Sequence, residues 1–63
     1  MRLLRIKEVE KRVGISGTQI RRLERAGHFP ARAEISERSF GYAEDEVDHW
    51  IEERLAAREV QAA

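Results

Sequence analysis

Three arginines and a threonine lie on one face of a helix that the sequence predicts over residues 17–26. The four side chains, called the basic ridge below, are Thr18, Arg21, Arg22 and Arg25. At about 100° per residue they fall within a sector of about 100°, opposite the apolar Ile20 and Leu23. A guanidinium bonds bidentately to guanine edges or to phosphate, and one such helix fits the major groove of duplex DNA. An ordinary solvated face usually mixes both signs of charge, so we interpret the ridge as a nucleic-acid-binding surface.

The predicted helix carries its own start and stop signals. Ser16 is a good N-cap, and Gln19 three residues later completes a capping-box pattern. Gly27 suits a left-handed stop, and Pro30 prevents the helix from resuming. The N–H groups at such a helix start also attract phosphate. We therefore expect Ser16 and Gln19 to join the ridge in binding DNA, although the cap competes for Gln19.

A shorter helix is predicted just upstream. Ile6, Val9 and Val13 follow helical spacing, which indicates a helix over residues 6–13. Only residues 14–16, Gly-Ile-Ser, separate it from the next helix. Two short helices joined by a three- or four-residue turn that contains glycine are typical of a helix-turn-helix.

A hairpin is predicted over residues 33–42, with Arg38 at its tip. We expect Ile35 and Phe40 to point to one side of it. Two interpretations of Arg38 stay open. It reaches phosphate or the minor groove as a wing residue, or its charge keeps a strand edge from pairing. Leu3 and Leu4 form either a short strand or a segment leading into the first helix.

A third helix is predicted over residues 44–57. Its apolar residues keep the spacing i, i+3, i+4 and i+8, and they are Val47, Trp50, Ile51 and Leu55. Acidic residues in its first turn suit the positive end of the helix dipole. Residues 56–63 either extend this helix or fray. The sequence thus predicts a single domain over residues 1–63, mainly α with a small β-hairpin: a winged helix-turn-helix of three helices and a two-stranded wing.

Charge divides the chain into two unlike halves. Residues 1–32 hold nine basic and three acidic groups, and residues 33–63 hold three basic and nine acidic groups, so a net charge of zero hides +6 and −6. Such asymmetry favours a polyanion-binding face with an acidic back. The alternative is that the halves pair through surface salt bridges, which contribute little stability. An acidic back that meets the basic flank of the next copy also suggests self-association on DNA, head to tail or as a dimer.

The sequence gives no support for catalysis. It has no cysteine, no phosphate-binding glycine loop and no nucleophile elbow. His28 and His49 are too far apart for a metal-ligand spacing, so we expect no catalytic residue, no metal and no cofactor. No apolar run exceeds three residues, which predicts a cytoplasmic, nucleoid-associated protein with no membrane partner.

Several motifs resemble the AlpA family of small phage-type DNA-binding regulators. The most specific are Gly14-Ile15-Ser16, Ala26-Gly27-His28-Phe29-Pro30 and Glu46-Val47-Asp48-His49-Trp50-Ile51. The resemblance covers residues 3–55 and implies a fold similar to MerR-like and excisionase proteins. It also implies control of prophage or mobile-element genes, in some members an excisionase role. Gly17 and Arg21 depart from the residues usual in the family, so no base preference carries over.

We therefore expect a sequence-specific regulator of double-stranded DNA. The alternatives are an excisionase that bends attachment-site DNA, and a protein-interaction adaptor that works through its acidic third helix. These hypotheses imply a recombinase or RNA polymerase as a protein partner.

Overall fold

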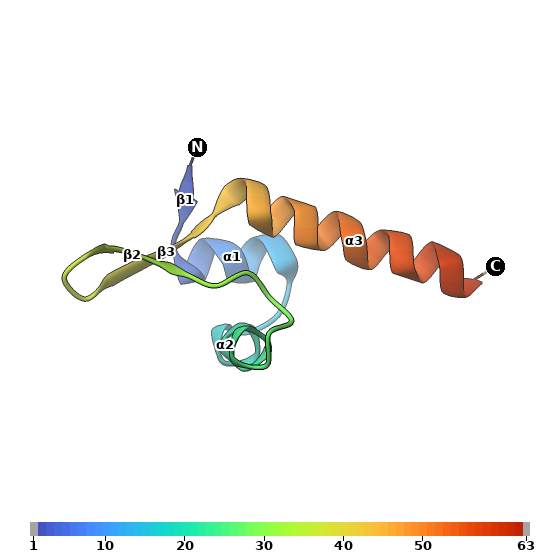
Figure 1. The fold of residues 1–63 in the computed structure, drawn as a ribbon, viewed down its shortest axis with the longest axis horizontal. Coiled ribbons are helices and arrows are strands. Elements are labelled where there is room, and N and C mark those ends of the chain that lie inside the picture. Colours follow the sequence, from blue (N-terminus) through green and yellow to red (C-terminus); the bar gives the residue numbers. More distant parts are fainter. Residues whose placement is uncertain (1, 63) are drawn as a thin grey trace.

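The computed structural model describes residues 2–62 and shows three helices and a small antiparallel sheet. In chain order the elements are β1 (Leu3–Leu4), α1 (Ile6–Val13), α2 (Gly17–Arg25), β2 (Ala33–Ser36), β3 (Ser39–Ala43) and α3 (Glu44–Ala62). The central strand is β3, which pairs with β1 on one side and β2 on the other. The β2–β3 wing and α3 point away from the α1–α2 pair in opposite directions (Figure 1). This is the expected winged helix-turn-helix, with β1 as a third strand.

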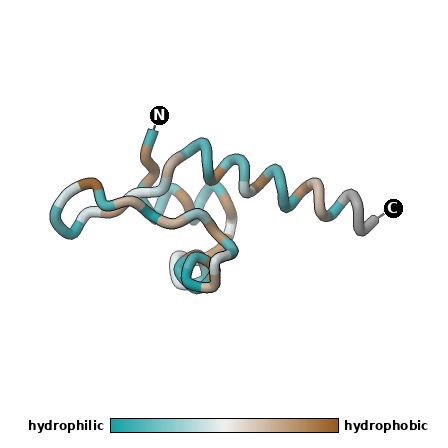
Figure 2. The backbone as a smooth tube through the Cα atoms, in the orientation of Figure 1, coloured by the Kyte–Doolittle hydropathy of each residue, from teal (hydrophilic) through white to brown (hydrophobic). Residues whose placement is uncertain are grey.

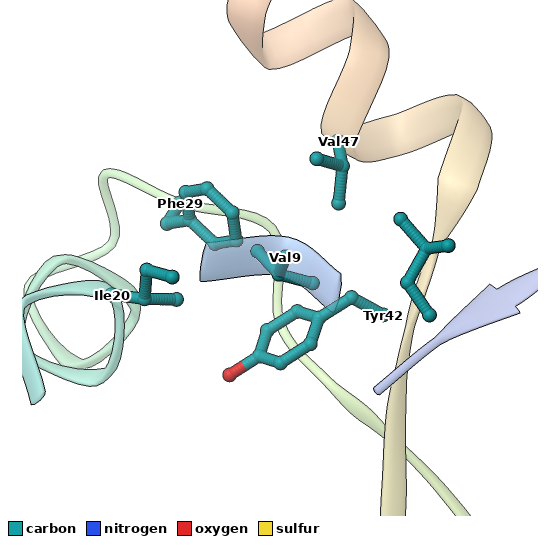
Figure 3. Close-up of a cluster of buried hydrophobic side chains, with 6 residues drawn as sticks. Val9, Ile20, Phe29, Tyr42 and Val47 are labelled. Carbon is teal, nitrogen blue, oxygen red and sulfur yellow. The ribbon is translucent and has the colours of Figure 1, made fainter. Parts of the chain in front are cut away.

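One apolar core joins these elements. Its buried side chains are Leu4, Val9, Ile20, Phe29, Tyr42 and Val47. Five of them are labelled in Figure 3, where side chains from both helices of the helix-turn-helix meet those from β3 and α3. The Phe29 ring contacts Tyr42 and Trp50 edge-to-face, at centroid distances of 5.7 and 4.9 Å. Each buried side chain of this size contributes about 1.5–3 kcal/mol, so this small core orients α2 relative to the wing.

The turn between α1 and α2 contains glycine, as predicted. Gly14 adopts φ 88° and donates its N–H to the Glu10 carbonyl at 2.8 Å. This left-handed conformation is strained for residues with a Cβ, so glycine ends α1 there. Gly27, at φ 82°, plays the same part after α2. Ile15 packs against the core and so holds the turn to the body.

The register of the wing differs from the expectation for Ile35 and Phe40. Phe40 pairs with Glu34, and the irregularity between Glu34 and Ser36 displaces Ile35. Ile35 Cδ1 then lies over Gly41, 2.7 Å from where a Cβ on that glycine would be. Because neighbouring residues of a strand face opposite sides, Ile35 and Phe40 lie on opposite faces of the sheet. The expectation of a shared side was wrong, since a bulge shifts the alternation that sequence pattern assumes.

The third helix extends beyond residue 57, which is one of the two outcomes that the sequence left open. It runs to Ala62, and its first half packs on the body through Val47, Trp50 and Ile51. Leu55, expected on the same apolar stripe, is 45% exposed because α3 has left the body by that point. Figure 2 shows hydrophilic residues alternating with hydrophobic ones along the coloured part of this projecting segment. Within residues 2–62, no helix combines the length and apolar character needed to cross a membrane.

Candidate nucleic-acid interface

The basic ridge lies on the solvent face of α2. Thr18 and the three arginines are all exposed, whereas Ile20 on the opposite face is fully buried. None of the ridge arginines forms an ion pair with a side chain among residues 2–58. Three positive charges thus face outward together, and an anionic partner is the chemistry that they suit.

Elsewhere the two oppositely charged halves do pair. Arg12 of α1 reaches α3, with Nη1 at 2.8 Å from Asp48 Oδ1 and Nη2 at 3.0 Å from Glu44 Oε2. The hydrogen bond to Asp48 is the main cause that raises the pKa of Arg12 above its ordinary value. Arg2 also reaches α3, with Nη1 at 3.8 Å from Glu44 Oε2. Salt bridges between the halves therefore form on the side of the molecule that carries α3, and the ridge takes no part in them.

The start of α2 is less open to phosphate than expected. Ser16 Oγ accepts the Gln19 N–H at 3.2 Å, so the N-cap forms. The Glu10 carboxylate of α1 accepts the Gly17 N–H. Two donors of the first turn are thus satisfied within the chain, and a negative charge sits beside them. The Gly17 and Gln19 N–H groups, which we expected to be free for phosphate, therefore already have partners within the chain.

Packing explains why residue 17 is a glycine. A Cβ there would lie 3.0 Å from Glu10 Oε2 and 3.1 Å from Ile6 Cγ1. The close approach of α1 to α2 therefore favours glycine where the AlpA family usually has a basic residue. Sequence spacing alone did not reveal this contact, because it depends on how the two helices cross.

Glu24 connects α2 to the wing. Its Oε1 accepts a hydrogen bond from the Tyr42 hydroxyl at 2.5 Å, and its Oε2 accepts one from the backbone N–H of Arg32 at 3.1 Å. Burial, followed by the bond to Glu24, raises the pKa of Tyr42 to about 12. Tyr42 is 2% exposed and its ring reaches from β3 into the core (Figure 3). No local sequence pattern indicates this role of Glu24, because it depends on α2 and β3 being adjacent.

The tip of the wing holds a strained arginine. Arg38 adopts φ 64° in the β2–β3 turn and is exposed. The left-handed region costs a residue with a Cβ roughly 1–2 kcal/mol, which glycine avoids. At the base of the wing, the Arg32 guanidinium lies 4.5 Å from the centroid of the Phe40 ring. The backbone conformation thus orients Arg38, and the contact with the Phe40 ring orients Arg32.

An open groove of about 670 Å³ lies on the other side of the molecule, between α3 and the segment that follows α2. Phe29 and Trp50 form its apolar part, and the Trp50 Nε1–H donates to the His28 carbonyl at 2.6 Å. Its charged lining is mainly acidic, from Asp45, Glu46, His49, Glu53 and Arg54. His49 Nε2 lies 3.6 Å from Glu53 Oε1. No group of three or more metal-ligating side chains occurs in the part of the chain that the structure describes.

A family model agrees with the resemblance drawn from the motifs. The model described as the prophage CP4-57 regulatory protein (AlpA) matches residues 2–55, which span every element up to the point where α3 leaves the body. No curated protein matches the chain.

Proposed function

Because the chain belongs to the AlpA family of prophage regulatory proteins, we propose that it is a sequence-specific double-stranded DNA-binding regulator of phage or mobile-element transcription. It acts by binding and not by catalysis, in the cytoplasm at the nucleoid. The observation that carries the proposal is the basic ridge, whose three arginines are exposed and unpaired among the described side chains.

In this proposal α2 enters the major groove and the wing lies on the DNA backbone. The nine residues of α2 span about 14 Å, which suits contact with a few consecutive base pairs. Arg21, Arg22 and Arg25 read base edges or phosphates, and Thr18 contacts the groove near the helix start. Ser16 acts through the cap that it forms, and the exposed Gln19 contacts the edge of the same site.

The direct test compares Arg22→Ala with Arg58→Ala on a duplex selected by the protein from a random pool. Both changes remove one exposed positive charge, but Arg58 lies on the projecting part of α3. We expect Arg22→Ala to cost about 1–3 kcal/mol of specific binding and to relax preference at one base pair. Arg58→Ala should leave both unchanged. Equal effects of the two variants, or wild-type protein that selects no duplex, would contradict the proposal.

An excisionase role remains the alternative for the same DNA-binding surface. Such a protein bends attachment-site DNA and assists a recombinase, so an excision assay with the cognate recombinase separates it from a promoter regulator. If excision is lost when the protein is absent, while transcription from the neighbouring promoter stays unchanged, the alternative is favoured.

The acidic groove along α3 favours a protein contact in addition to DNA. We propose that it receives a basic surface, either the basic flank of a second copy on DNA or a recombinase or polymerase subunit. A helix-turn-helix of this size covers few base pairs and needs several copies for useful specificity. Sedimentation of the protein with duplexes of one and two sites, for wild type and Glu53→Lys, tests self-association. Binding without cooperativity in the wild type would exclude it.

A further inference from the structure

A second hollow, of about 170 Å³, lies between the helix-turn-helix and the wing. Four arginines line it, and each comes from a different segment. Arg5 immediately precedes α1, Arg21 is on α2, Arg32 precedes β2, and Arg38 is at the wing tip. Ile6, Phe40 and Tyr42 complete the wall. We call this set of four arginines the arginine hollow.

The charge of this hollow is largely uncompensated. None of its arginines forms an ion pair among the side chains of residues 2–58, in contrast to Arg2 and Arg12. The nearby Glu24 carboxylate accepts hydrogen bonds from the Tyr42 hydroxyl and from the backbone N–H of Arg32. Glu24 thus offsets one charge and leaves a net excess of about three. Because like charges held together repel, the arrangement suits a site that an anion completes.

Two of the four arginines are oriented before any ligand binds. The Arg32 guanidinium stacks on Phe40 at 4.5 Å, and the φ of 64° fixes how Arg38 leaves the turn. A guanidinium that is already oriented loses less conformational freedom on binding. The stacking also covers one face of Phe40, which leaves that face closed to a nucleobase. The size of the hollow is below the 300–1,000 Å³ typical of small-molecule pockets, so a single phosphate group suits it better than a nucleotide.

We propose that the arginine hollow binds one phosphodiester group of the DNA backbone and so fixes how deep, and in which register, α2 enters the major groove. This inference rests on the proposed function. It assigns Arg5 and Arg32, which lie outside the basic ridge and the wing tip, as phosphate-contacting residues. It also gives the phosphate contact a different place from the start of α2, where Glu10 occupies the Gly17 N–H.

The test measures the salt dependence of binding to a selected and to a scrambled duplex for Arg5→Ala, Arg32→Ala and the control Arg58→Ala. Each hollow variant should weaken both duplexes by the same factor, about five- to tenfold at 0.1 M salt, and should lower the salt slope by about 0.9. The preference for the selected duplex should stay unchanged, unlike in Arg22→Ala. Thermal unfolding of each variant checks that the fold is retained, and Arg32→Lys should recover part of the lost affinity.

A neutral methylphosphonate placed at one backbone position at a time locates the group concerned. At one position it should weaken the wild type and leave Arg32→Ala unaffected. If a methylphosphonate weakens binding at no position while inorganic phosphate still competes with duplex far better than chloride of equal ionic strength, the hollow is a free-anion site and the assignment is overturned. Wild type that binds duplex, with hollow variants no weaker than Arg58→Ala, refutes the hollow alone. Wild type that binds no duplex refutes the proposed function.

Discussion

Replacing Arg38 with glycine should stabilise the protein and weaken its binding to DNA. The left-handed φ of 64° costs arginine roughly 1–2 kcal/mol. Glycine avoids that cost but loses about 0.5–1 kcal/mol through its greater freedom in the unfolded chain. The net expectation is a gain of up to about 1.5 kcal/mol. Because Arg38 is exposed and unpaired among the described side chains, removing it sacrifices no ion pair there.

Urea unfolding, followed by the fluorescence of Trp50, measures the first effect; the chain has one tryptophan. Duplex binding over a range of salt concentrations measures the second, where one lost phosphate contact lowers the slope by about 0.9. Arg38→Lys is the control, since it keeps both the charge and the strained turn. A variant Arg38→Gly that is more stable and binds DNA as tightly as wild type would refute the wing contact. One that is less stable would refute the strain argument.

Two further predictions concern the elements that position the ridge and the wing. Gly41→Ala should destabilise the fold by about 1 kcal/mol, because the new Cβ meets Leu3 Cβ at 3.3 Å and must displace the exposed Ile35 Cδ1, 2.7 Å away. Chemical denaturation measures this, and Ile35→Ala in the same chain should recover part of the loss; full stability of Gly41→Ala alone would contradict the register. Folding raises the pKa of Tyr42 from 10.0 to about 12, so the native state keeps its proton longer. Stability should therefore fall by about 1–2 kcal/mol as pH rises from about 10 to about 12, after allowance for solvent near the hydroxyl. Tyrosinate absorbance reports the titration directly because the chain has one tyrosine, and Glu24→Gln should lower the midpoint. A midpoint at the ordinary value in the wild type would show that the tether is absent.

Much of the fold was predictable because local signals agree with one another. Helical spacing of Ile6, Val9 and Val13, the glycine after them and the cap at Ser16 all indicate the same two helices. The exposure of the ridge followed from the position of Ile20, since a short amphipathic helix buries one face. These features depend on residues within a few positions of one another.

The remaining features depend on contacts between distant segments. Glu10 reaches the start of α2, and Glu24 reaches Tyr42, only after the helices and sheet have packed. The arginine hollow gathers side chains from four segments, which no local pattern indicates. The bulge at Ile35 reverses the expected face of that residue. The length of α3 was left open because its last residues carry helix-forming types without an apolar stripe.

The central claim is that the basic ridge reads the major groove, and methylation interference tests it most directly. Guanine N7 faces the major groove, where Arg21, Arg22 or Arg25 would bond it. In a selected duplex, methylation of particular guanines at N7 should prevent binding by the wild type, and Arg22→Ala should lose sensitivity at one of them. Binding that tolerates methylation at every guanine N7 but fails when the minor groove is modified would contradict the account.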